Sequence, residues 1–317
     1  MRDKVLLLNP PANIKYIRDF YCSFSSKANY YWPPQDLVVL SGILRQKYEV
    51  EVLDAVSSNF EEDICYKKII KSSAIALIFT TGIVSFDKDM EFIERIKKDK
   101  NIKVIGISSI FRSIGKEIME SCPFLDALLI DFTDESIVDY LMGDYTKCDY
   151  IIYRKGGDIH LSRKDKEGEF SIGIPLHELF INRSNRIPIF GDSPFSIMVG
   201  SIGCNFKCKF CVAGTIKLRK RILMEVIEEL KYISNLGIKR VFFVDPIFTA
   251  DKNRVFEFCE DLKSNGIKIE WICNAHPATL QDERLLKGMK IAGCKALMIG
   301  IESANDEYPS SIRKCNV

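Results

Sequence analysis

Three cysteines on one short segment carry the clearest chemical signal in this sequence. Cys204, Cys208 and Cys211 lie in the segment 203–211, directly after the mostly apolar run 195–202. Three thiolates on one loop can each bind one iron of a cubic iron–sulfur cluster. Such a cluster has four irons, so three protein ligands leave one iron open to a small molecule. Catalytic metal sites differ from structural ones in the same way, because they keep one position free of protein ligands.

Two other interpretations of the three cysteines are open. A structural zinc site could take its fourth ligand from Cys259, Cys273 or Cys294, but structural zinc sites usually pair their cysteines in two separated groups. Cysteine also packs as a small buried hydrophobe. Lys207 and Lys209 stand between the three cysteines, and polar loops of this kind do not build cores. We therefore favour the iron–sulfur cluster, and we expect the three more distant cysteines to be packing residues.

The spacing Cys-x-x-x-Cys-x-aromatic-Cys, with Phe210 as the aromatic residue, resembles the signature of the radical S-adenosylmethionine (radical SAM) superfamily. The resemblance extends beyond this loop to the cobalamin-binding branch of the superfamily. The further segments that carry it are Arg219–Arg221, Phe243–Thr249, Trp271–Cys273, Met289–Cys294 and Gly300–Ser303.

The resemblance implies an enzyme with a 4Fe-4S cluster whose open iron is chelated by S-adenosylmethionine. Reductive cleavage of this cofactor would generate a 5'-deoxyadenosyl radical that attacks a small-molecule or peptide substrate of unknown identity. Cobalamin-dependent methyl transfer is one outcome that the resemblance allows, and another radical transformation is the alternative. A flavodoxin or ferredoxin would supply the electron.

The resemblance also assigns residues to cofactor binding. Phe210 would pack near the adenine, while Asp245, Glu302 and Ser303 follow expected strands and would face the cofactor. For the last three residues, a helix-capping or turn role is the alternative.

The overall composition excludes several other classes of protein. The chain has 45 basic and 43 acidic residues among 317, so it offers no charge excess that would favour nucleic acid or an acidic membrane. No apolar run is long enough to span a membrane, and no signal peptide is visible. The eleven cysteines are odd in number and widely scattered. We therefore expect a cytoplasmic protein with reduced thiols.

Residues 1–143 are expected to form a doubly wound, flavodoxin-like domain. Short apolar runs alternate with helical patterns, and the expected strands are 5–9, 50–54, 74–80, 103–108 and 127–131. In the resembling family this domain binds cobalamin, and the segments 9–11 and 32–34 match its pattern. The loops 106–111 and 131–135 lack the glycines that the family often has there, and no histidine precedes His160. These departures weaken the case for cobalamin.

Residues 144–187 are expected to be a linker that contains a β-hairpin, and residues 188–317 a partial (β/α) barrel of the radical SAM type. The barrel pattern supplies four strand–helix units, with strands at 196–202, 240–244, 268–273 and 296–301. Because such barrels have about six units, we expect this one to be incomplete at its C-terminal end. A catalytically incompetent remnant or binding module is therefore one alternative function. A tRNA methylthiotransferase-like enzyme is another.

Overall fold

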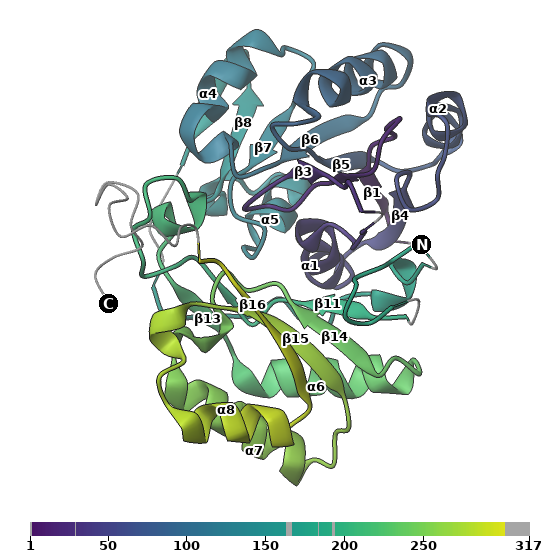
Figure 1. Cartoon of the computed structure of the whole chain (residues 1–317). Coiled ribbons are helices and arrows are strands. Elements are labelled where there is room, and N and C mark those ends of the chain that lie inside the picture. Colours follow the sequence, from purple (N-terminus) through teal and green to yellow (C-terminus); the bar gives the residue numbers. More distant parts are fainter. Residues whose placement is uncertain (1, 29, 163–166, 183, 192–193, 302–317) are drawn as a thin grey trace. The chain divides into compact units, whose positions relative to one another are not determined.

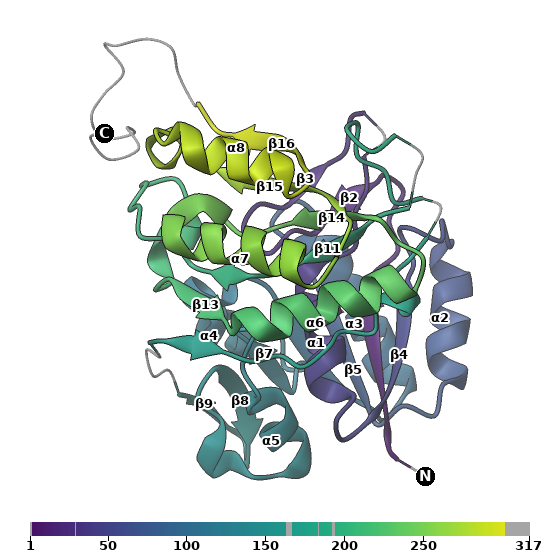
Figure 2. The same cartoon turned by 90° about the horizontal axis from the view of Figure 1, so that it is seen from below.

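The computed structural model describes residues 2–28, 30–162, 167–182, 184–191 and 194–301, and these residues divide into two units. The first unit contains residues 1–164 and 175–186, and the second contains residues 165–174 and 187–317. Figures 1 and 2 show both units from two directions. None of the described helices combines the length and the apolar character that crossing a membrane requires.

A seven-stranded sheet with the order β4-β1-β5-β6-β7-β8-β9 organises the first unit. The first five strands in this order are parallel, as the alternation of apolar runs and helical patterns predicts. They are β4 (Glu49–Asp54), β1 (Lys4–Asn9), β5 (Ala76–Thr80), β6 (Lys103–Ile107) and β7 (Ala127–Leu129).

Helices cover both faces of this sheet, which confirms the doubly wound fold class. One face packs in a continuous apolar core against α2 (Glu62–Lys71), α3 (Phe86–Asp99) and α4 (Phe111–Ser121). Helix α1 (Gln35–Leu44) contacts β1, β4 and β5, and Figure 1 shows it on the side of the sheet away from α2 and α3. A further α-helix of this unit is α5 (Ser136–Met142).

The hairpin expected in a linker is part of the first sheet. Strands β8 (Ile151–Lys155) and β9 (Asp158–Leu161) form the expected hairpin, but β8 also pairs antiparallel with β7. The apolar side chains of Ile151 and Ile152 explain this, because the pairing buries them almost completely. Residues 144–161 therefore extend the first unit.

The segment between β1 and α1 covers the carboxyl ends of several strands in the first unit. It contains the small hairpin β2 (Tyr16–Ile17) and β3 (Phe24–Ser25). Buried Arg18 donates to Asn9 Oδ1 at the end of β1 over 2.7 Å and forms an ion pair of 2.6 Å with buried Asp89. Asp89 in turn accepts a hydrogen bond from Thr81, which follows β5. Arg18 thus fills the crevice between β1 and β5, where the strand order reverses.

The second unit has a parallel four-stranded sheet in the order β11-β14-β15-β16. Its strands are β11 (Ser196–Met198), β14 (Arg240–Phe243), β15 (Glu270–Ala275) and β16 (Cys294–Ile299). The helices between them are α6 (Leu223–Asn235), α7 (Lys252–Ser264) and α8 (Glu283–Ile291), and Figure 2 shows these helices side by side. This is the βα alternation of a partial barrel.

One expected strand of the second unit is divided in two. The expected strand 196–202 breaks at Val199 and Gly200, and its second part, β12 (Ser201–Ile202), joins a separate small sheet. In that sheet β13 (Arg219–Arg221) pairs with β12 and with β10 (Glu169–Phe170). The sequence pattern does not predict a strand at residues 219–221.

Candidate functional site

The antiparallel pairing of β12 with β13 brings together the two ends of the loop 203–218. The register places Ile202 opposite Arg219, and the amide of Cys204 donates to the carbonyl of Ile216 over 3.2 Å. Gly203 has a φ of +73°, and a Cβ atom at this position would lie 2.3 Å from the carbonyl oxygen of Lys217. Only glycine permits this close approach of the two chain segments.

Backbone hydrogen bonds also shape the loop between the cysteines. The amide of Phe206 donates to Sγ of Cys204 over 3.4 Å, and the amide of Cys211 donates to the carbonyl of Cys208 over 3.1 Å. A hydrogen bond donated to sulfur stabilises its thiolate form. Gly214 packs so closely that a Cβ atom there would lie 2.6 Å from the carbonyl oxygen of Phe206. The cysteine loop is therefore a closely packed structure with defined contacts.

All three cysteines line one cavity of about 380 Å³. Each of them is partly exposed. The rest of the wall comes from the loop itself and from the carboxyl ends of β14, β15 and β16, at Phe206, Phe210, Ala213, Pro246, Ile247, Asn274, Ala275, His276, Met298, Ile299 and Gly300. This is the end of the sheet at which parallel βα folds bind their ligands.

No three His, Cys, Asp or Glu side chains among the described residues are arranged to bind one metal ion. A mononuclear site needs all its ligands around a single centre. A cubic cluster places each cysteine on a different iron, so its ligands need only surround a common space and need not converge on one point. The arrangement of the three cysteines around one cavity meets the second requirement.

An aromatic stack forms one wall of the cavity. The rings of Phe206 and His276 have centroids 4.1 Å apart and an interplanar angle of 18°. His276 is 2% exposed, and its Nδ1 accepts a hydrogen bond from the amide of Ala278 over 3.1 Å. Sequence reasoning found no firm role for His276 and none for Phe206. Phe210 also lines the cavity and is 53% exposed.

Asp245 does not line the cysteine cavity, although it follows β14 as expected. Its carboxylate accepts hydrogen bonds from the amide of Gly200 over 2.7 Å and from the hydroxyl of Ser201 over 2.8 Å. Burial raises the pKa of Asp245 to about 6. This geometry makes Asp245 a positioning residue for the segment that leads into the cysteine loop, and not part of the cavity wall. The contacts also explain the break between β11 and β12.

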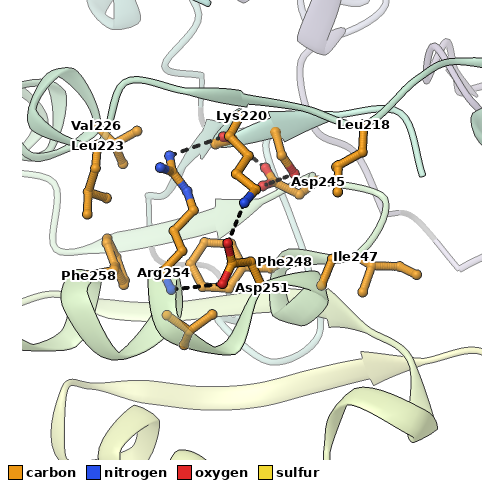
Figure 3. Close-up of a pocket in the computed structure, with 14 residues that line it drawn as sticks. Leu218, Lys220, Leu223, Val226, Asp245, Ile247, Phe248, Asp251, Arg254 and Phe258 are labelled. Atoms are coloured by element: carbon orange, nitrogen blue, oxygen red, sulfur yellow. Dashed lines mark hydrogen bonds and ion pairs between the residues drawn. The ribbon is translucent and has the colours of Figure 1, made fainter. Parts of the chain in front are cut away.

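Figure 3 shows Asp245 in a neighbouring pocket of about 20 Å³, which is room for about one water molecule. Lys220 forms an ion pair there with Asp251, which caps helix α7 through the amide of Arg254. Arg254 donates to the carbonyl of Arg221. These charged groups satisfy one another, so we assign this pocket to the packing of α7 against β13.

Two of the expected site residues are not among those that the structure describes. Glu302 and Ser303 lie outside the described residues, so their expected cofactor contacts stay predictions. The basic residues near the cysteine loop do not form one surface. Arg221 is fully buried in an ion pair with Glu229, whereas Lys207 and Lys209 are exposed.

A family model described as the radical SAM superfamily matches residues 198–317. Residues 198–317 of the second unit thus match a radical SAM domain. The uncharacterized methyltransferase PH0819 of Pyrococcus horikoshii is 27% identical over 299 residues, which cover 89% of this chain and 63% of the relative. The ribosomal protein uS12 methylthiotransferase RimO of Clostridium novyi is 26% identical over 245 residues, or 72% of this chain and 50% of that protein.

Solved structures of radical SAM enzymes share the fold of nearly the whole chain. The radical SAM methyltransferase TsrM of Kitasatospora setae, with cobalamin and a [4Fe-4S] cluster bound, superposes with a TM-score of 0.70 at 17% identity. The match covers 95% of this chain and 61% of TsrM. The cobalamin-dependent enzyme OxsB gives a TM-score of 0.68 at 15% identity and covers 96% of this chain and 44% of OxsB. The chain thus spans less than two thirds of the length of these relatives.

Proposed function

We propose that this protein binds a 4Fe-4S cluster through Cys204, Cys208 and Cys211 and reductively cleaves S-adenosylmethionine at its open iron. The observation that carries the proposal is the single cavity that these three cysteines share with the carboxyl ends of three parallel strands. The radical SAM family match over residues 198–317 supports it.

The described residues fit this pair of cofactors. The three thiols supply soft ligands of the kind that iron–sulfur clusters take. The volume of about 380 Å³ falls in the range of ordinary small-molecule pockets. When bound, the cluster would supply one electron and S-adenosylmethionine would supply the reactive adenosyl group.

The protein's own residues hold and shield this chemistry. The stacked rings of Phe206 and His276 would exclude water from one side of the cavity. Asn274 lines the cavity, and its Nδ2 donates to the carbonyl of Asp245 over 2.8 Å, which ties β15 to the end of β14. Asp245 fixes the segment before the cysteines. These contacts position the cavity wall before any ligand binds.

Further parts of the proposal concern the electron donor and the outcome of the reaction. We assign the donor to a flavodoxin or ferredoxin, because exposed Lys207 and Lys209 flank the cysteines and offer positive charge to an acidic partner.

The fold likeness to TsrM and the methyltransferase name of PH0819 favour methyl transfer. The TsrM structure holds cobalamin, and in this chain the doubly wound first unit is the part that would hold it; no step of the proposal passes through cobalamin.

The methylthiotransferase alternative has less support from the first unit. The resembling enzymes of that class carry additional cluster cysteines in their N-terminal domain. Here Cys65 is fully buried within α2, Cys148 is buried beyond α5, and Cys22 is exposed in the segment before α1. These cysteines lie on separate segments and do not share one loop as Cys204, Cys208 and Cys211 do.

The direct experiment incubates anaerobically reconstituted protein with dithionite and S-adenosylmethionine and measures 5'-deoxyadenosine by chromatography. Wild type should produce it, and Cys208→Ala should not. Cys22→Ala is the matched control, because Cys22 lies outside the radical SAM domain, and it should retain activity. Wild-type protein that binds about four irons per chain yet leaves S-adenosylmethionine intact would favour the catalytically incompetent remnant.

A further inference from the structure

The side chain of Phe206 links the cysteine loop to the end of β15. Phe206 is half-buried, whereas its neighbours Asn205 and Lys207 are exposed. Its ring stacks on His276 with a centroid distance of 4.1 Å and an interplanar angle of 18°. His276 directly follows β15 and is 2% exposed. The stack therefore holds this stretch of the loop against the end of the sheet.

Several hydrogen bonds fix His276 in place. Its Nδ1 accepts from the amide of Ala278 over 3.1 Å, and its carbonyl accepts from the hydroxyl of Thr279 over 2.7 Å. The hydroxyl of Thr279 also shares a hydrogen bond of 2.5 Å with that of Thr249, which lies in the turn after β14 and is 1% exposed. The residue under the Phe206 ring is thus anchored to the carboxyl ends of two strands.

The backbone of Phe206 reaches the first of the three proposed cluster ligands. Its amide donates to Sγ of Cys204 over 3.4 Å. Its carbonyl oxygen lies so close to Gly214 that a Cβ atom there would approach it to 2.6 Å. Two contacts of Phe206 therefore position this amide, namely the close approach to Gly214 and the stack on His276.

A hydrogen bond to a cluster sulfur changes how readily a cluster accepts an electron. The reduced cluster carries one more negative charge than the oxidised cluster, so a donor at its sulfur stabilises the reduced form more strongly. The reduction potential is therefore higher with the hydrogen bond than without it.

We propose that His276 is a positioning residue that raises the reduction potential of the 4Fe-4S cluster. Through its stack on Phe206, it holds the Phe206 amide against Sγ of Cys204. One electron enters the cluster from a low-potential flavin or iron–sulfur protein, and no covalent bond forms or breaks in this step. The inference rests on the proposed function in one respect, because Cys204 must be a cluster ligand.

The same stack would also keep water away from the cluster, and this effect has the opposite sign. Water stabilises the more highly charged reduced cluster, so opening the cavity to water raises the reduction potential. Loss of the hydrogen bond from the Phe206 amide lowers it. The sign of the change in potential therefore separates the positioning role of His276 from a shielding role.

The test measures the reduction potential of the anaerobically reconstituted full-length protein by mediated redox titration, followed by electron paramagnetic resonance. His276→Asn removes the ring and keeps a side-chain acceptor for the Ala278 amide, so its potential should shift to a more negative value. His276→Phe keeps a ring for the stack and loses that acceptor, so its potential should stay at the wild-type value. An unchanged or more positive potential in His276→Asn, or an equal negative shift in both variants, would overturn the proposal.

Hydrogen–deuterium exchange with mass spectrometry of the same three proteins tests the contact itself. The peptide that contains Phe206 should exchange faster in His276→Asn than in wild type or His276→Phe. A peptide from α6 should exchange equally in all three proteins, which shows that the variants are folded. Equal exchange at Phe206 in all three would contradict the positioning role.

Neither measurement requires cleavage of S-adenosylmethionine. Protein that holds a cluster and shows the expected shifts, yet leaves S-adenosylmethionine intact, would contradict the proposed function and support the role of His276. Protein that cleaves S-adenosylmethionine but keeps the wild-type potential in His276→Asn would support the proposed function and overturn the role of His276. Protein that takes up no cluster would overturn both.

Discussion

Replacing Gly203 with alanine tests whether the close approach inside the cysteine loop holds the cluster ligands in place. Gly203 has a φ of +73°, which costs an alanine about 1–2 kcal/mol. The added Cβ atom would also lie 2.3 Å from the carbonyl oxygen of Lys217, and backbone cannot move aside as a flexible side chain can. This clash can therefore be relieved only if residues 203 and 217 move apart. Cys204, the next residue, would move with them.

Gly237→Ala provides a matched control for this experiment. Gly237 has a φ of +80° after α6, and a Cβ atom there would have no neighbour within 4 Å. The control should therefore lose about 1–2 kcal/mol of unfolding free energy and bind as much iron as wild type. Only Gly203→Ala should lose most of its iron.

The assay is iron content and absorbance after anaerobic reconstitution, with circular dichroism to confirm that both variants remain folded. Equal iron in Gly203→Ala and wild type would refute the argument that the crossing of the two chain segments positions Cys204. Equal loss of iron in both variants would refute it as well, because the φ angle alone would then explain the result.

Three further predictions concern buried charges. Arg18→Met leaves Asp89 without its ion-pair partner and should lower the unfolding free energy by about 3–5 kcal/mol in urea titrations; a loss below 1 kcal/mol would contradict the assigned pair. Burial raises the pKa of Asp36 from 3.8 to about 7, so the stability contributed by its protonated form is present below pH 3.8 and is lost as the pH rises through 7. The unfolding free energy of Asp36→Asn relative to wild type should therefore rise from pH 4.5 to pH 8, by up to about 4 kcal/mol at 1.4 kcal/mol per pKa unit. A difference between variant and wild type that is the same at both pH values would contradict this prediction. Asp245→Ala removes the acceptors for the amide of Gly200 and the hydroxyl of Ser201, and it should lower iron content while the thermal midpoint of the first unit, which does not contain Asp245, stays unchanged; unchanged iron would count against its positioning role.

The sequence predicts the parallel strands and helices of both units because their apolar runs are long and regular. The strands expected at 5–9 and 50–54 appear as Lys4–Asn9 and Glu49–Asp54. The cysteine loop is equally predictable, since its spacing has a chemical reason. These features depend on local patterns that tertiary contacts do not change.

Features that depend on one long-range contact were not predictable from local patterns. The three residues of β13 are too few to show an alternating pattern, and all three are basic. The division between β11 and β12 follows from the hydrogen bonds of Asp245, which lies 45 residues away from Gly200. The stack of Phe206 on His276 joins two loops that no periodicity connects. Glycines at 203 and 214 were the only local signals of the crowded loop.

The central claim is that Cys204, Cys208 and Cys211 hold a cluster with one open iron. Electron paramagnetic resonance of the dithionite-reduced protein tests it most directly, with and without S-adenosylmethionine. We expect the signal of a reduced 4Fe-4S cluster that changes when S-adenosylmethionine is added and that is lost in Cys208→Ala. Bound zinc in place of iron, or a cluster signal that S-adenosylmethionine leaves unchanged, would contradict it.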